Sequence, residues 1–244
     1  MIYLFQLVNG IGLGMLYFLL AVGLSIIFGL LHFVNFAHGA FYLLGAYFVY
    51  DMTERGLNFW AALLVAPFIV AGLAALTESV LLRRIYHLPH TFHILVTVGL
   101  ALMVQELVII LWGPVGGNVS TPGALSGVLM LGDFIYPQYR LFVIGLTLVL
   151  AIGLWWLLEG TRLGAVVRAG SESTDMVSLL GIDILRVNVI GGMGSYTGAL
   201  IAGLLVGIVQ SIMTTLWPEG ARLMIYLGMG LVILTMPRGL LGRA

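Results

Sequence analysis

Long apolar runs separated by short polar breaks dominate the chain. A helix needs about 20 mostly apolar residues to span a bilayer, and several runs reach that length. The expected crossings cover residues 7–31, 34–50, 58–82, 91–112, 141–158, 189–216 and 222–236. This pattern predicts an all-α fold, a polytopic transmembrane helix bundle with about seven crossings, formed by residues 1–244 as a single transmembrane domain.

The arginines predict the orientation of the bundle. Cytoplasmic loops of membrane proteins are enriched in basic residues. If Arg83 and Arg84 are cytoplasmic, seven of the ten arginines fall on the inner side, and only Arg55, Arg140 and Arg222 fall outside. We therefore expect an outside N-terminus and an inside C-terminus.

Composition narrows the function further. Hydrophobic residues make up 61% of the chain and charged residues 8%, against about 25% charged in a soluble domain. The sequence contains no lysine and no cysteine, which excludes a P-loop lysine, a thiolate nucleophile and disulfides. The net charge of zero gives no basic surface for nucleic acid. We expect no enzyme activity, no cofactor and no metal.

Two glycine-containing clusters, residues 32–39 and 191–198, combine weak helix formers with polar side chains. Irregular polar backbone at membrane depth is tolerated only where protein or a watery cavity covers it, and broken helices there expose dipoles to a solute. An equally good interpretation is that both clusters start helices at the cytoplasmic interface. The candidate solute-path residues are Asn35, His38, Gly39, Gly191, Gly192, Gly194 and Ser195.

Other features of the apolar runs favour ordinary packing. Gly10/Gly14, Gly194/Gly198 and Gly203/Gly207 have the four-residue spacing that lets membrane helices approach closely. Glu78 lies near the interface and is expected to be an anchor. The deeper Glu106, beside Gln105, favours a buried polar contact between helices over an ion relay.

Residues 159–188 break the membrane pattern with seven charged side chains and are expected to be cytoplasmic. Met176, Leu179 and Leu180 form an apolar stripe on a short helix that ends at Gly181. Such a helix either lies on the membrane or docks into a partner protein, and its acidic character favours the partner. The candidate docking residues are Gly164, Arg168, Ala169, Glu172, Met176, Leu179, Leu180 and Gly181.

Motifs along nearly the whole chain resemble one family. They include the run from Gly23 to Gly29, the Asn-Phe-Ala-His-Gly motif at residues 35–39, Thr97–Leu100, Leu111–Pro114, the run from Ser178 to Ile182, Gly191–Ser195 and Pro237–Leu240. In this order they resemble the permease subunits of ABC importers for branched-chain amino acids, of the Asn-Phe-Ala-His-Gly type.

The resemblance implies that separate subunits form the pathway, supply the energy and deliver the solute. Two permease subunits, usually non-identical, form the pathway in the bacterial inner membrane. Two cytosolic ATPase subunits drive it, and a periplasmic solute-binding protein delivers the solute. Residues 159–188 then correspond to the cytoplasmic coupling segment that the ATPases hold.

The chain departs from the family pattern in two places. Ser173 stands where family members usually carry an acidic residue. Near Asn188 and Val189 the chain lacks a segment that family members carry. That segment is long enough for roughly two crossings of about 20 residues each. The alternatives are a permease for urea or short-chain amides, a truncated family member that does not transport, and a self-sufficient channel.

Overall fold

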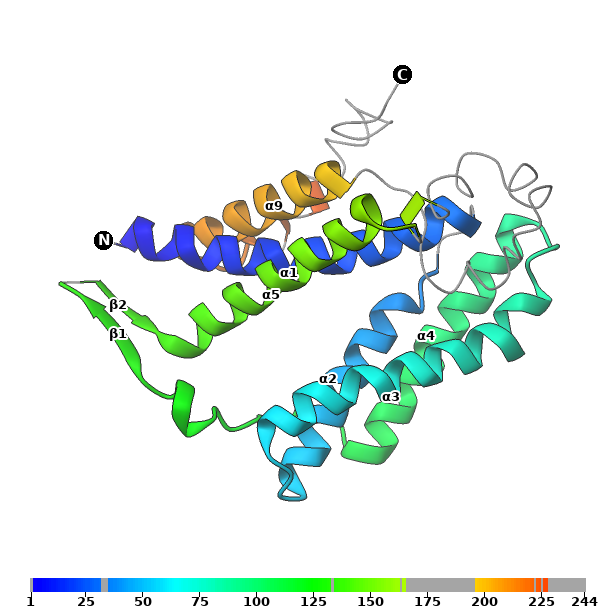
Figure 1. The fold of residues 1–244 in the computed structure, drawn as a ribbon, viewed down its shortest axis with the longest axis horizontal. Helices are drawn as coiled ribbons and strands as arrows, with labels where there is room; N and C mark the ends of the chain where they lie inside the picture. Colours follow the sequence, from blue (N-terminus) through cyan, green and yellow to red (C-terminus); the bar gives the residue numbers. More distant parts are fainter. Residues whose placement is uncertain are drawn as a thin grey trace. The chain divides into compact units, whose positions relative to one another are not determined.

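The structure is a computed structural model, and it describes residues 2–31, 35–132, 134–162, 164–165, 196–221, 223–224 and 226–227. The helices are α1 (Ile2–Leu31), α2 (His38–Glu54), α3 (Phe59–Val80), α4 (His90–Trp112), α5 (Gln138–Gly160) and α9 (Tyr196–Leu216). Two short strands, β1 (Val128–Leu131) and β2 (Phe134–Pro137), lie between α4 and α5 (Figure 1).

Five of these helices are long and apolar enough to cross a membrane, among the described residues. The candidate spans are Ile2–Ile27, Phe59–Arg84, Thr91–Trp112, Gln138–Gly160 and Gly198–Leu216, of which the second runs past the end of α3. The chain is therefore an α-helical, multi-pass membrane protein. The expected crossing at residues 34–50 corresponds to the 17-residue helix α2, which begins at His38. Most of the expected crossing at residues 222–236 lies outside the described residues.

The polar segment between residues 113 and 140 contains structure that the sequence did not predict. β1 and β2 pair antiparallel, with Val128 opposite Pro137 and Leu131 opposite Phe134. Gly132 has a φ of 60°, a left-handed conformation that glycine adopts without steric cost, at the tight turn of this hairpin. The backbone N–H of Gln138 donates to the Gly127 carbonyl, which joins the hairpin to the start of α5.

The described chain divides into two compact units, residues 1–30 with 123–244 and residues 31–122. In the first unit, α1, α5 and α9 share one core. Met15, Phe18 and Val22 of α1 and Ala151 of α5 are buried there, and Leu200 and Leu204 of α9 pack against them.

Glycines let α1 and α9 approach at backbone distance, as the spacing of Gly10/Gly14 and Gly203/Gly207 predicts. A Cβ atom added at Gly10 would lie 2.6 Å from the Cα of Ile208, and one added at Gly14 would lie 2.7 Å from the Cα of Leu204. A Cβ at Gly203 would meet the Gly14 carbonyl oxygen at 2.8 Å. These contacts involve backbone atoms, so a larger residue would force the helices apart.

In the second unit, α2 packs against both α3 and α4. Its buried residues are Ala40 and Leu44, and α3 contributes the buried Ala62 and Ala66. α3 contains Pro67, which removes one backbone hydrogen bond but is tolerated in membrane helices. The small buried side chains allow α2 to lie close to its neighbours.

Candidate functional site

The break before α2 is held by Asn35. Its side chain is 7% exposed, and its carboxamide oxygen accepts a 3.0 Å hydrogen bond from the backbone N–H of Ala37. The Asn35 carbonyl accepts a bond of 3.2 Å from the N–H of His38. Asparagine commonly forms such turns because its side chain replaces a backbone acceptor. These two bonds place Asn35 in the turn that leads into α2.

His38 and Gly39 form the first turn of α2 and are more accessible than Asn35. His38 is half-buried, and Gly39 is exposed. A Cβ atom added at Gly39 would meet no atom within 4 Å, so no packing contact in the described chain requires glycine there. The space beside Gly39 is open to another molecule or chain.

The second predicted cluster lies outside the described residues, which begin again at Tyr196. Gly191, Gly192, Gly194 and Ser195 are therefore not placed relative to Asn35. Most predicted docking residues also lie outside the described residues, namely Arg168, Ala169, Glu172, Met176, Leu179, Leu180 and Gly181.

Gly164 is the predicted docking residue that the structure places. It is buried directly after α5, and its N–H donates to the Thr161 hydroxyl oxygen at 3.2 Å. A Cβ atom added at Gly164 would collide with the carbonyl oxygen of Leu158. The chain can turn back on the end of α5 only because this residue has no side chain.

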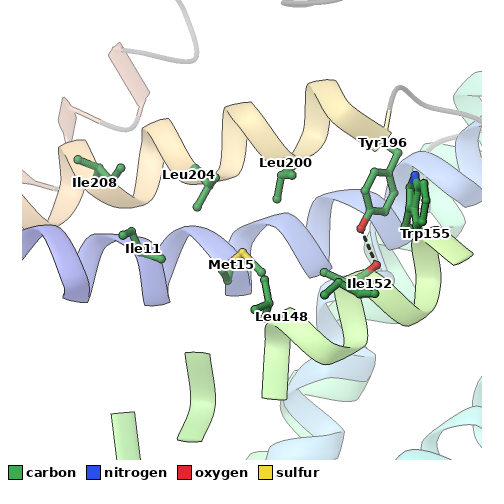
Figure 2. A pocket seen from close by; sticks show the side chains of 10 residues that line it. Ile11, Met15, Leu148, Ile152, Trp155, Tyr196, Leu200, Leu204 and Ile208 are labelled. Carbon is green, nitrogen blue, oxygen red and sulfur yellow. Dashed lines mark hydrogen bonds between the residues drawn. The ribbon is translucent and has the colours of Figure 1, made fainter. Parts of the chain in front are cut away.

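An apolar groove of about 580 Å³ lies between α1, α5 and α9 (Figure 2). Met15, Leu148, Trp155, Leu200 and Leu204 are among the side chains that line it. The Tyr196 hydroxyl at its edge donates to the Ala151 carbonyl at 2.6 Å. The lining has no charged side chain, so it suits an apolar group and cannot pair with the ammonium or carboxylate of an amino acid.

A polar cluster that the sequence did not reveal joins the start of α1 to the hairpin and α5. The side-chain oxygen of Asn9 accepts bonds from the Tyr136 hydroxyl at 2.8 Å and from Arg140 Nη1 at 2.6 Å. Tyr136 also stacks edge-to-face on Phe5. Burial raises the pKa of the Tyr136 hydroxyl, which keeps it protonated as a donor. An asparagine inside the first apolar run was the only signal for this cluster.

A second cluster joins the ends of α2 and α4. Asp51 forms an ion pair with Arg55, with Nε and Oδ2 2.7 Å apart, and accepts a 3.2 Å bond from the Trp112 indole N–H. The hydrogen bond from Arg55 is the largest influence on the Asp51 carboxyl and lowers its pKa. This cluster places the C-terminal ends of α2 and α4 side by side.

The two intramembrane carboxylates differ in their surroundings. Glu78 accepts a 3.1 Å hydrogen bond from the Tyr86 hydroxyl, which agrees with its prediction as an interfacial anchor. Burial, with the nearby Glu78 carboxylate, raises the pKa of that hydroxyl. Glu106 is instead exposed on α4.

These features define a membrane protein of crossing helices with polar clusters at the helix ends. Its sequence identifies the family. Residues 6–190 match the family described as the permease component of branched-chain amino acid transport systems, and the chain belongs to that family.

Relatives named as branched-chain amino acid transport permeases are similar over most of their length. The chain is 24% identical to the high-affinity branched-chain amino acid transport system permease protein BraD of Pseudomonas aeruginosa, with 99% of this chain and 96% of BraD covered. It is 25% identical to the permease protein LivH of Escherichia coli K12, with the same coverage. The probable LivH of Methanocaldococcus jannaschii is 22% identical over 80% of this chain and 76% of the relative. No solved structure matches the chain.

The alignments also show a difference in length. The alignment with BraD extends over 299 positions, 55 more than the 244 residues of this chain. BraD therefore carries at least 55 residues for which this chain has no counterpart.

Proposed function

We propose that the chain is the transmembrane permease subunit of an ABC importer, which translocates branched-chain amino acids across the bacterial inner membrane. The match of residues 6–190 to the permease family carries the proposal. The names of BraD and LivH supply the solute class. Energy comes from separate ATPase subunits, because a chain without lysine cannot form a P-loop of its own.

The assembly contains three kinds of partner. A second permease subunit completes the pathway, two cytosolic ATPase subunits bind residues 159–188, and a periplasmic binding protein delivers the solute. Residues 1–244 act as one permease domain, with residues 159–188 as its coupling segment. Closure of the ATPases would move that segment and switch the bundle between outward and inward access.

The hydrogen bonds around Asn9 and around Asp51 support the proposal that α2 crosses the membrane, although α2 has only 17 residues. The bonds from Tyr136 and Arg140 to Asn9 bring the starts of α1 and α5 to the same end of their unit. If two helices start on the same side of the membrane, the chain must cross the membrane an even number of times between those two starts. With α1, α3 and α4 crossing, a crossing by α2 makes this number even, which supports α2 as a further span. The Asp51–Trp112 bond agrees, because α2 and α4 then run parallel with one crossing between them.

The direction of α9 supports a topology in which α5 ends and α9 begins on the same side of the membrane. The Ser211 hydroxyl, near the end of α9, lies 2.7 Å from the Gln6 side-chain oxygen at the start of α1. At the other end, Tyr196 packs edge-to-face on Phe18. α9 is therefore antiparallel to α1 and, with the N-terminus outside, begins on the cytoplasmic side. Together with the orientation expected from the arginines, that direction is consistent with cytoplasmic residues 159–188, about seven crossings and an inside C-terminus.

The solute path in this proposal passes the first turn of α2 and the second glycine cluster. His38 and the open space at Gly39 face the solute, with Gly191, Gly192, Gly194 and Ser195 contributing backbone from the other cluster. Asn35 acts mainly by starting α2, since its side-chain oxygen is already bonded to Ala37.

The stretch absent from this chain lies close to Asn188 in the proposal. The family match ends at residue 190, where such a gap would interrupt it. Fifty-five positions suffice for two crossings of about 20 residues, and losing an even number preserves the orientation of everything after the gap. The shorter length of this chain relative to BraD favours one alternative function, that of a family member that assembles with partners but does not transport.

Uptake into reconstituted vesicles tests the proposal. Vesicles containing the chain, the second permease and the ATPases receive binding protein outside and ATP inside, and labelled leucine uptake is measured. We expect ATP-dependent uptake that is lost with an ATPase that cannot hydrolyse ATP. Uptake of labelled urea but not leucine would contradict the solute class, uptake without ATPase would indicate a channel, and no uptake would favour the non-transporting alternative.

A further inference from the structure

Helices α5 and α9 are incompletely packed against each other. The apolar groove of about 580 Å³ lies between them and α1, with Leu148 and Trp155 of α5 on one side and Leu204 of α9 on the other (Figure 2). Side chains that line a groove lose the contacts that a close-packed neighbour would provide. The relative position of the two helices therefore depends on what joins them at the edge of the groove.

Tyr196 joins α9 to α5 at that edge. It is the first residue of α9, and its hydroxyl donates a 2.6 Å hydrogen bond to the carbonyl oxygen of Ala151 (Figure 2). Ala151 is buried in α5, nine residues before the helix ends at Gly160, which is about 14 Å along the axis. The bond thus lies within the candidate span Gln138–Gly160, where lipid tails offer the hydroxyl no other acceptor, so the bond is costly to break.

The ring of Tyr196 is held by a further helix. It packs edge-to-face on Phe18 of α1, with the ring centroids 5.0 Å apart and the ring planes at 81°. Phe18 is completely buried in the core that α1, α5 and α9 share. Because this aromatic contact restricts the orientation of the ring, the hydroxyl stays aimed at the Ala151 carbonyl.

Tyr196 also has a particular place in the sequence. It directly follows Gly194 and Ser195, which the proposed function places on the solute path. Helix α5 ends at Gly160, where the proposed coupling segment, residues 159–188, begins. The hydrogen bond therefore joins the helix that leads into the coupling segment to the start of the helix that follows the second glycine cluster.

We propose that Tyr196 is a positioning residue for transport, which holds the start of α9 on α5 so that α5 and the second glycine cluster move as one body. The proposal rests on the proposed function, because it uses the coupling segment and the solute path. A displacement of residues 159–188 then reaches the glycine cluster through the hydrogen bond between Tyr196 and Ala151. Without the hydroxyl, the groove widens instead, and ATP hydrolysis moves the solute path less.

The number of leucine molecules imported per ATP hydrolysed tests this role in the vesicle uptake assay. Tyr196→Phe keeps the ring against Phe18 and removes only the hydroxyl. We expect the ratio to fall about five- to tenfold, the effect of one lost hydrogen bond, with ATPase binding and the rate of ATP hydrolysis within about twofold of wild type. A wild-type ratio in Tyr196→Phe would overturn the proposal.

A matched control removes a similar hydrogen bond at the other end of α9. The Ser211 hydroxyl is buried and lies 2.8 Å from the Gln6 carbonyl oxygen of α1, to which it donates. We expect Ser211→Ala to lower the unfolding temperature about as much as Tyr196→Phe does, while leaving the ratio of leucine to ATP unchanged. An equal fall of the ratio in both variants would show a general loss of stability and overturn the positioning role.

Spin labels on α5 and α9 test the same contact without transport. The chain has no cysteine, so Trp156→Cys and Ile201→Cys give one pair of labels at positions outside the groove lining. Electron–electron double resonance measures their distance in the nucleotide-free complex and in the ATP-bound complex with an ATPase that cannot hydrolyse ATP. We expect one distance in both states with Tyr196, and a longer or broader distribution in ATP-bound Tyr196→Phe. A distance that changes with ATP in the presence of Tyr196, or that Tyr196→Phe leaves unaltered, would overturn the proposal.

The two measurements separate this proposal from the proposed function. Leucine uptake by the wild-type complex, with an α5–α9 distance that does not depend on the Tyr196 hydroxyl, overturns the role of Tyr196 alone. A distance that does depend on the hydroxyl, without ATP-dependent uptake, supports the contact and contradicts the transport function.

Discussion

The side-chain oxygen of Asn9 accepts a 2.8 Å hydrogen bond from the hydroxyl of Tyr136, 127 residues further along the chain. This contact joins the start of the first helix to the hairpin before α5. It fixes the relative direction of α1 and α5, on which the proposed topology depends. A polar side chain in the first apolar run thus has a structural role at the end of the helix.

Removing the Tyr136 hydroxyl should destabilise this junction. Tyr136→Phe keeps the ring stacked on Phe5 but leaves Asn9 with one donor fewer, at a cost of about 1 kcal/mol. Thermal unfolding of the detergent-purified protein measures the effect. Tyr139→Phe, at a more exposed position of α5, should behave as wild type. Equal stability of both variants would mean that the Asn9 contact contributes nothing.

Enlarging a glycine between α1 and α9 should separate the two helices. A methyl group at Gly14 would lie 2.7 Å from the Leu204 Cα, so Gly14→Ala should cost about 1–3 kcal/mol through overpacking. Gly153→Ala in α5 is the matched control, because its Cβ would meet no atom within 4 Å. Unfolding midpoints in the same detergent compare the two. A Gly14→Ala midpoint equal to that of the control would contradict the close approach.

The Asp51 cluster predicts a pH dependence of stability. Its interactions hold the pKa of Asp51 in the folded protein below the unfolded value of about 3.9. The stabilisation is therefore present above the unfolded pKa and is lost as the pH falls through the lower folded pKa. Wild type should unfold at a higher temperature than Asp51→Asn at pH 6, and the difference should shrink toward pH 3. A difference that stays constant between these pH values would exclude the carboxylate as its source.

Asn35 should be replaceable by another side chain that can start α2. Asn35→Ser retains an acceptor for the Ala37 N–H, whereas Asn35→Leu does not. In the vesicle uptake assay we expect the serine variant to transport within about threefold of wild type and the leucine variant to lose about tenfold, because leucine leaves the Ala37 N–H of this buried turn without its acceptor, at a cost of about 1–3 kcal/mol. If the serine variant were as impaired as the leucine variant, the Asn35 amide would have to contact the solute itself.

Periodicity and composition predicted the helices well, and they predicted contacts between distant segments poorly. The spans at residues 91–112 and 58–82 are nearly those of α4 and α3, because a long apolar run bounded by charges has no alternative in a bilayer. The glycine spacing correctly indicated close helix packing, but not that Gly10 and Gly14 of α1 would meet Gly203 and Gly207 of α9. The β-hairpin was missed because its strands have only four residues each, too few for a periodic signal.

The candidate site was predictable only in part, for a related reason. The motif at Asn35 indicated a break in the helix, and α2 does begin at His38. The pairing of Asn9 with Tyr136 and Arg140 could not be predicted, since it joins residues more than 120 positions apart through a loop without a recognisable pattern. Exposure of Glu106 likewise depends on which face of α4 meets α2, which the weakly amphipathic sequence does not specify.

The most direct test of the account is the side of the membrane on which residues 159–188 lie, because a cytosolic ATPase can drive the bundle only if it can reach them. The chain has no cysteine, so Glu172→Cys and Glu219→Cys each provide one unique site for a membrane-impermeant maleimide. In intact spheroplasts we predict labelling of the cysteine at position 219 and none at position 172, with the reverse in inverted membrane vesicles. Labelling of position 172 in intact spheroplasts would contradict the account.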